Sequence, residues 1–267
     1  MIDLIGRAVA VLRNEGVGGL FRSTGAYLYN QLLFDLRIRT RSYLNTKRGH
    51  RGLNRPYKRI SLDPERIQLR YKGHFNQKKH LGAIKGGTWD DDVYPIKESP
   101  VYVGLRERFC EGVDWKETTY YKYKINKLKS QSEVNNYYSV SQFEERLTYV
   151  DELYEDIRDR GYKSQSELDA GNWDPNRHPL VTRAHERTGE IGVNISRDGQ
   201  ILHNDGIHRL SIAKILGIDE IPVQVIVRHK KWQETRNSLL RKNSIPSEYD
   251  SHPDIVSFDR RMQPADI

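Results

Sequence analysis

The chain has 267 residues, and its 44 Lys and Arg residues against 36 Asp and Glu residues give a net charge of +8 at pH 7. The excess lies in residues 1–60, which hold twelve basic and three acidic residues (+9), while the rest holds 32 basic and 33 acidic residues (−1). This distribution argues against a nucleic-acid surface along the whole chain, and the single cysteine, Cys110, excludes an intrachain disulfide or a cysteine-based zinc cluster.

The basic segment, residues 1–56, is predicted to form a helical leader that ends in a polar linker. Apolar residues recur at helical spacing in residues 2–14 and again in about 24–44. Three interpretations are open for this leader: a helical hairpin that packs on its own domain, a helix that lies on an anionic membrane surface, or a docking segment for a protein partner or a nucleic acid.

The rest of the chain divides into a body, residues 57–242, and a tail, residues 243–267. The body is predicted to contain a helical insertion over about 99–185. The tail contains three prolines and shows no hydrophobic periodicity. We therefore expect the tail to be extended.

Two signals for helix starts occur within the insertion. Ser99 followed by Pro100 is typical of a capping residue and the first helical position. Ser141 and Glu144 have the spacing of a capping box, in which the hydroxyl and the carboxylate each accept a free backbone N–H. A helix is expected after each of these positions.

The last third of the body predicts a compact strand–strand–helix–strand unit. Residues 191–197 and 200–203 are apolar and strand-like, and the Asp-Gly pair at 198–199 favours a turn between them. Apolar residues at helical spacing follow at 210–216, and a further strand is predicted at 221–227.

The turn before the predicted helix, Asn204 to Arg209, is the strongest candidate for a functional site. Gly206 permits a close backbone approach, and free N–H groups and the helix dipole at a helix start attract anions. His208 and Arg209 add hydrogen-bond donors. The hypothesis is that these residues hold a phosphate; the alternative is an ordinary turn in which Asp205 caps the helix.

Residues 191–229 resemble the core of the ParB/sulfiredoxin superfamily. The resemblance is carried by the hairpin, by the Gly-Ile-His-Arg turn at 206–209, by the Leu-Gly pair at 216–217 and by the Ile-Pro-Val strand at 221–223. It implies an α/β (α+β) fold in which a small mixed sheet is flanked by helices, here preceded by the basic leader. It also implies that the turn binds a nucleotide.

The same turn restricts the activities that the resemblance can imply. Ile207 occupies the position of the attacking cysteine of sulfiredoxins, so sulfiredoxin activity is not expected. Partition-type ParB proteins resemble the turn with a Glu at this position that assists metal and nucleotide, which argues against CTP-clamp activity here. Only 38 residues follow His229, too few for the helix-turn-helix domain of those proteins.

Small-molecule kinases form a third branch of the superfamily and resemble the turn more closely. They imply ATP or another nucleotide, with Mg²⁺, and a carboxylate that orients the acceptor hydroxyl. Asp205 is the candidate catalytic residue. Asp90, Asp91 and Asp92 form a second acidic cluster, for which the alternative interpretation is a solvated loop anchored by the preceding tryptophan; no metal ligands are assigned.

Two histidines flank the predicted core without a functional pattern. The spacing of His203 and His229 matches no standard metal site, and ordinary hydrogen bonds at strand ends are expected for both. Lys230, Lys231 and Trp232 are interpreted as a helix start with the indole packed inward, rather than as a nucleic-acid contact.

The favoured function is a nucleotide-binding protein that acts as an ATP-dependent phosphotransferase on a small molecule. The alternatives are a nucleic-acid-associated ParB-like protein or nuclease, and a non-catalytic adaptor. No apolar run reaches the length of a membrane span. We expect a cytoplasmic protein, with peripheral attachment to a membrane or to a protein partner through residues 1–56 as a further option.

Overall fold

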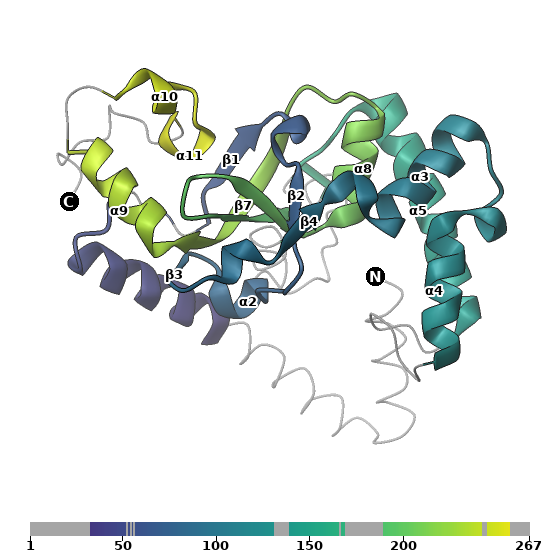
Figure 1. Ribbon diagram of the computed structural model, residues 1–267, viewed down its shortest axis with the longest axis horizontal. Helices are drawn as coiled ribbons and strands as arrows, with labels where there is room; N and C mark the ends of the chain where they lie inside the picture. The colour runs from purple at the N-terminus through teal and green to yellow at the C-terminus, as the bar shows by residue number, and fades with distance from the viewer. Residues whose placement is uncertain are drawn as a thin grey trace, which may run out of the picture.

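The computed structural model of the chain describes residues 33–51, 53, 55, 57–130, 139–165, 167–168, 189–241 and 245–256. Within these residues, one mixed sheet of seven strands has the order β1-β7-β5-β6-β2-β4, with β3 added beside β7 (Figure 1). The strands are β1 (Arg59–Leu62), β2 (Leu69–Tyr71), β3 (Ala83–Lys85), β4 (Val93–Pro95), β5 (Ile191–Ile195), β6 (Ile201–Asp205) and β7 (Ile221–His229). The mixed sheet and its flanking helices confirm the predicted α/β class.

The long strand β7 organises the sheet. β1 pairs antiparallel with its first half, β3 pairs parallel with its last residues, and β5 pairs parallel along its other edge. β5 and β6 form the predicted hairpin, and β2 pairs parallel with β6 and antiparallel with β4. Because both faces of the central strands are covered, β5 is buried along its whole length, which explains its apolar sequence.

The apolar residues of β7 contribute to two separate cores. Val225 belongs to a cluster that includes Leu210 of α8 (Ile207–Ile215), whereas Ile226 belongs to a cluster with Phe34 and Ile38. Phe34 and Ile38 come from the helix over residues 33–47. This part of the leader packs on its own domain, as one of the three interpretations proposes, and residues 1–32 lie outside the described residues.

Three helices pack beside α8 and build a further core on that side of the sheet (Figure 1). They are α3 (Pro100–Glu111), α4 (Thr119–Ser130) and α5 (Val140–Arg160). Ser99 and Pro100 begin α3 as predicted, and Gly112 ends it in the left-handed conformation. A Cβ at Gly104 would lie only 2.3 Å from the Cβ of Tyr120, so this glycine allows α3 and α4 to approach closely.

Short elements complete the described part of the fold. They are η1 (Pro64–Arg66), α2 (Gln77–His80), η2 (Trp89–Asp91), η3 (Ile96–Glu98), η4 (Trp115–Glu117), α9 (Lys230–Leu239), α10 (Ser247–Asp250) and α11 (Pro253–Val256). Trp232 of α9 is 1% exposed, which confirms that the indole packs inward.

The start of α5 differs from the prediction by two residues. The capping residue is Ser139, whose side chain accepts a hydrogen bond from the N–H of Gln142 at 3.2 Å. Ser141 already lies inside the helix, and the capping box expected with Glu144 is wrong. Both serines have a suitable hydroxyl, so the residue type does not distinguish the two positions.

The segment that we expected to be an extended tail, residues 243–267, instead contains α10 and α11. Asp254 of α11 is 1% exposed and forms ion pairs with Arg228 and Arg236. These buried ion pairs hold the segment against β7 and α9. Hydrophobic periodicity does not reveal such contacts, because they join residues that are distant in the sequence. Residues 257–267 lie outside the described residues.

Candidate functional site

The predicted phosphate turn joins β6 to α8. Gly206 is the residue before the helix and has φ +83°, in the left-handed region that favours glycine. A Cβ on Gly206 would also lie 3.2 Å from the Cα of Ile191, so the position is restricted in two ways. Gly206 has no side chain with which to cap α8, and the first N–H groups of a helix have no partner within the helix itself.

His208, in the first turn of α8, is held by a tyrosine from α4. Its Nε2 lies 3.1 Å from the hydroxyl oxygen of Tyr120. Burial, followed by the positive charges of Arg146, Lys124 and Arg70, lowers the pKa of His208 to about 3. His208 is therefore a neutral imidazole at pH 7, surrounded by basic side chains.

His203 lies inside β6 and is fully buried. It faces Arg70 of β2 and Val193 of β5 in the sheet. Neither ring nitrogen makes a hydrogen bond of ordinary geometry with the described residues. Burial, followed by the charge of Arg70, lowers the pKa of His203 to about 3, and an interaction with the main chain of Asp205 opposes part of this shift. The expectation of ordinary hydrogen bonds is thus wrong for this histidine.

Five side chains form what we call the basic cluster. They are Arg70, Lys124, Arg146, His203 and His208. Lys124 is 5% exposed, and its Nζ lies 5.9 Å from the ring centre of Tyr120. Burial and the nearby Lys127 lower its pKa to about 8, so it is still mostly protonated at pH 7. Within the described part of the chain, the charged side chains that shift the pKa of the two histidines are all basic.

Arg209 does not face the turn. Its guanidinium donates hydrogen bonds to the carbonyl oxygens of Gly189 at 3.0 Å and Lys163 at 2.8 Å, and lies 4.7 Å from the ring centre of Tyr162. Its Nη2 is also 3.6 Å from the buried carboxylate of Glu190. Arg209, which the sequence suggested as a phosphate-binding residue, instead joins two loops, because it binds a buried carboxylate and two carbonyl groups there.

Asn204 and Asp205 precede the turn and differ in environment. Asn204 is buried; its amide exchanges two hydrogen bonds of 3.0 Å with the main chain of Phe75 and accepts a third from Asn194 at 3.1 Å. Asn204 therefore fixes the loop after β2 and has little capacity left for a ligand. Asp205 is exposed, and its Oδ1 accepts the N–H of Gly206 at 2.8 Å. Its carboxylate stays accessible beside the turn.

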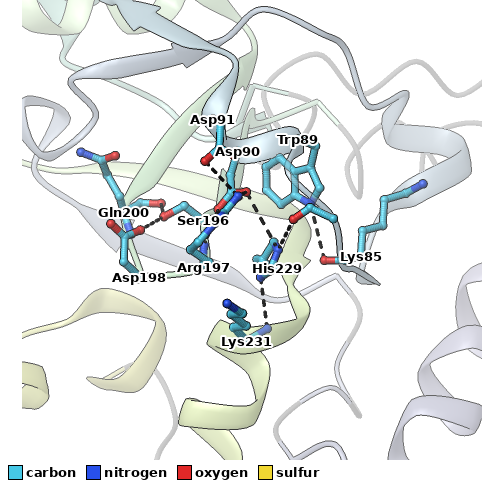
Figure 2. A network of polar contacts seen from close by, with 11 residues as sticks. Lys85, Trp89, Asp90, Asp91, Ser196, Arg197, Asp198, Gln200, His229 and Lys231 are labelled. Atoms are coloured by element: carbon cyan, nitrogen blue, oxygen red, sulfur yellow. Dashed lines mark hydrogen bonds and ion pairs between the residues drawn. The ribbon is translucent and has the colours of Figure 1, made fainter.

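The second predicted acidic cluster forms a separate network (Figure 2). Asp90 accepts three hydrogen bonds from the side chain and main chain of Arg197, at 2.6 to 2.9 Å. Burial would raise the pKa of Asp90, but the hydrogen bonds from Arg197 hold it down to about 2. Asp91 pairs with the same Arg197 from an exposed position, and Asp92 pairs with Lys72. Neither interpretation, a catalytic cluster or a solvated loop, describes the buried Asp90.

His229 completes this network with the hydrogen bonds that the sequence led us to expect (Figure 2). Its Nδ1 accepts the N–H of Lys231 at 3.1 Å at the start of α9. The neutral ring therefore carries its proton on Nε2, which donates to the carbonyl oxygen of Gly87 at 3.0 Å. Nε2 is 3.9 Å from Asp90, so His229 links β7 to the loop that carries the acidic residues.

Comparisons with protein-family models, characterised proteins and solved structures gave no significant match. The resemblance to the ParB/sulfiredoxin superfamily therefore depends on the residues of the turn and the elements around it. Among the described residues, no group of three or more His, Cys, Asp or Glu side chains is arranged to hold a metal ion. In the same residues, no helix is long and apolar enough to cross a bilayer.

Sequence reasoning missed three members of the basic cluster. Arg70, Lys124 and Arg146 come from β2, α4 and α5, far from the turn along the chain. No local pattern marks them: Lys124 is one of several lysines in α4, and the others on that helix are exposed. Only the packing of α4 and α5 against α8 selects the one lysine that turns inward.

Proposed function

We propose that the start of α8 and the basic cluster bind an anionic, phosphate-bearing ligand, with a nucleotide as the favoured one. The observation that carries the proposal is His203, a fully buried imidazole that lacks hydrogen-bond partners among the described residues. Buried polar groups are nearly always paired, so an unpaired one beside a helix start favours a bound group that would complete it.

A phosphate group fits the chemistry of this region. Each neutral histidine can donate one N–H, Arg70 supplies a permanent charge, and the first N–H groups of α8 add further donors. A dianion would also relieve the repulsion among side chains that lower one another's pKa. Arg70 takes the role that the sequence suggested for Arg209, since the guanidinium of Arg209 is already bound to the chain.

Phosphoryl transfer to a small molecule is the activity that we propose for this site. Asp205 supports it, because its carboxylate is exposed one residue before the turn and can accept the proton of an acceptor hydroxyl. Magnesium would arrive with the nucleotide and would neutralise its phosphates. Replacing Asp205 by Asn should therefore abolish ATP turnover while nucleotide binding persists, as measured by product release and calorimetry on the same sample.

Binding is tested by thermal unfolding with ATP, CTP or GTP plus Mg²⁺, and with inorganic phosphate. A ligand that binds only the folded chain raises the melting temperature, and at a hundredfold excess over Kd the gain is about 2.7 kcal/mol. The substitution Arg70→Gln should remove this increase. Arg39→Gln is the matched control, because Arg39 is exposed and lies on the helix that packs against the opposite face of the sheet.

The outcomes separate the alternatives. If no nucleotide and no phosphate raise the melting temperature, the proposal fails and a non-catalytic role remains. If the increase survives Arg70→Gln, the ligand binds elsewhere. Affinity for nucleic acid that falls steeply with salt would instead favour a nucleic-acid-associated protein.

A further inference from the structure

The helix over residues 33–47 has two apolar faces, and the sheet covers only one of them. Phe34 and Ile38 point inward and are 6% and 0% exposed. On the outside, Leu36, Tyr43 and Leu44 are 58%, 60% and 44% exposed. A helix that needs one apolar face for its own core thus presents a second one outward.

The outward residues form a continuous stripe. With 3.6 residues per turn, the stripe spans about 100° of the helix circumference. Its members are Leu33, Leu36, Thr40, Tyr43, Leu44 and Lys47. Leu33, Leu36 and Leu44 also line a shallow groove of about 520 Å³. The stripe therefore provides an apolar surface along the helix rather than scattered single side chains.

Basic side chains border the stripe. Arg37 and Arg48 lie along one edge and line the same groove, and both are exposed. Lys47 lies within the stripe, with its Nζ 5.6 Å from the ring centre of Tyr43. Residues 33–51 contain six Lys or Arg and one acidic residue, Asp35, which is paired with Arg39. The apolar stripe is thus set in a strongly positive surface.

We propose that this face docks on an anionic phospholipid surface, with the leucines and the tyrosine in the interfacial layer and the arginines on the headgroups. A leucine stripe gains free energy from leaving water, whereas a nucleic-acid backbone offers no apolar partner for it. A second copy of the same face would bring Arg37 and Arg48 against like charges. Exposed leucines bordered by arginines therefore fit an anionic lipid surface better than a nucleic acid or a second copy of the same face.

The test is co-sedimentation of the full-length protein with vesicles of phosphatidylcholine containing about 30% phosphatidylserine, against vesicles of phosphatidylcholine alone. Binding should require the anionic lipid and should weaken as salt rises above about 100 mM, where the Debye length falls below about 10 Å. The double variant Leu36→Glu, Leu44→Glu should bind at least about tenfold more weakly.

The matched control is Tyr123→Glu, Val140→Glu, which adds the same charge at similarly exposed apolar positions of α4 and α5. This control should bind like the parent. Equal loss in both variants would overturn the proposal, because net charge alone would then explain the binding. Failure of the parent to bind at low salt would also overturn it. If in addition only the leucine variant melts at a lower temperature, the stripe is covered by another part of the chain.

Discussion

Buried arginines at the α9–α11 end of the molecule meet a carboxylate, whereas the charged side chains of the described residues that shift the pKa of His203 and His208 are all basic. Asp254 lies 2.6 Å from Arg228 and 3.3 Å from Arg236, and it also accepts a hydrogen bond from Trp232. His203, by contrast, has no hydrogen-bond partner among the described residues. Asp254 and its arginines thus hold the fold together, whereas the imidazole of His203 keeps unused hydrogen-bonding capacity, on which the proposed ligand site depends.

The largest expected effect on stability is at Asp254, whose carboxylate pairs with Arg228 and Arg236. Burial would raise the pKa of Asp254, but the charges of Arg228 and Arg236 hold it well below its usual range. Replacing Asp254 by Asn leaves two buried guanidinium groups without their counter-charge, which should cost about 3–5 kcal/mol in urea unfolding at pH 7. The control Asp250→Asn, in the exposed turn of α10, should cost under about 0.5 kcal/mol. Equal losses would mean that the network contributes nothing specific.

A smaller effect is expected at Asp90, and it should depend on pH. The folded pKa of about 2 lies below the ordinary 3.8, so this carboxylate stabilises the fold fully above about pH 5 and loses that contribution as pH falls towards 2. The substitution Asp90→Asn should cost about 2 kcal/mol at pH 7, and the difference from the parent should vanish in acid.

Asp91→Asn provides the control for that experiment. Asp91 pairs with the same Arg197, but its side chain is 62% exposed, so the loss should stay under about 1 kcal/mol. Thermal or urea unfolding of both variants between pH 2 and pH 7 measures the comparison. A pH-independent difference at Asp90 would contradict the role assigned to its ion pair.

The smallest effect on stability is expected within the basic cluster. Because the buried His203 has no hydrogen-bond partner in the part of the chain that the structure describes, His203→Leu should change the free energy of unfolding by less than about 1 kcal/mol at pH 7, and it should abolish nucleotide binding. A large loss of stability would instead show that the imidazole is a structural group.

The variant His203→Leu should also change how the stability of the protein depends on pH. The folded pKa of His203 and of His208 is about 3, so the unfolded chain binds protons that the folded chain does not between pH 6.5 and 3. As the pH is lowered through that range, the free energy of unfolding should therefore decrease by about 1.4 kcal/mol per pH unit for each histidine. His203→Leu should remove one of the two contributions, as measured by urea unfolding from pH 7 to pH 4.

Local patterns were sufficient for the central elements of the fold. The hairpin of β5 and β6, helix α8 and strand β7 all occur where periodicity and turn residues predicted them. The unit is local because consecutive elements pack on one another. By contrast, the ion pairs of Asp254 with Arg228 and Arg236 join segments about 20 residues apart, and the α10–α11 segment was missed for that reason.

For the candidate site, the sequence predicted the position of the turn but not the directions of its side chains. Gly206 lies directly before the helix, where the sequence placed it, but Arg209 turns to Glu190 and two carbonyl groups. A sequence gives the type of each side chain. It does not give the direction of a side chain for which several hydrogen-bond acceptors compete. For the same reason the sequence left both an acidic site and a solvated loop open for Asp90, whose ion pair with Arg197 depends on packing.

The close approach at Gly104 has a consequence for the reach of distant substitutions. A Cβ at this position would lie 2.3 Å from the Cβ of Tyr120, whose hydroxyl oxygen lies 3.1 Å from Nε2 of His208. A single methyl group at position 104 would push α4 outward and shift Tyr120 and Lys124 together. The spacing of the basic cluster, and with it the proposed anion site, thus depends on a position that contributes no side chain to it.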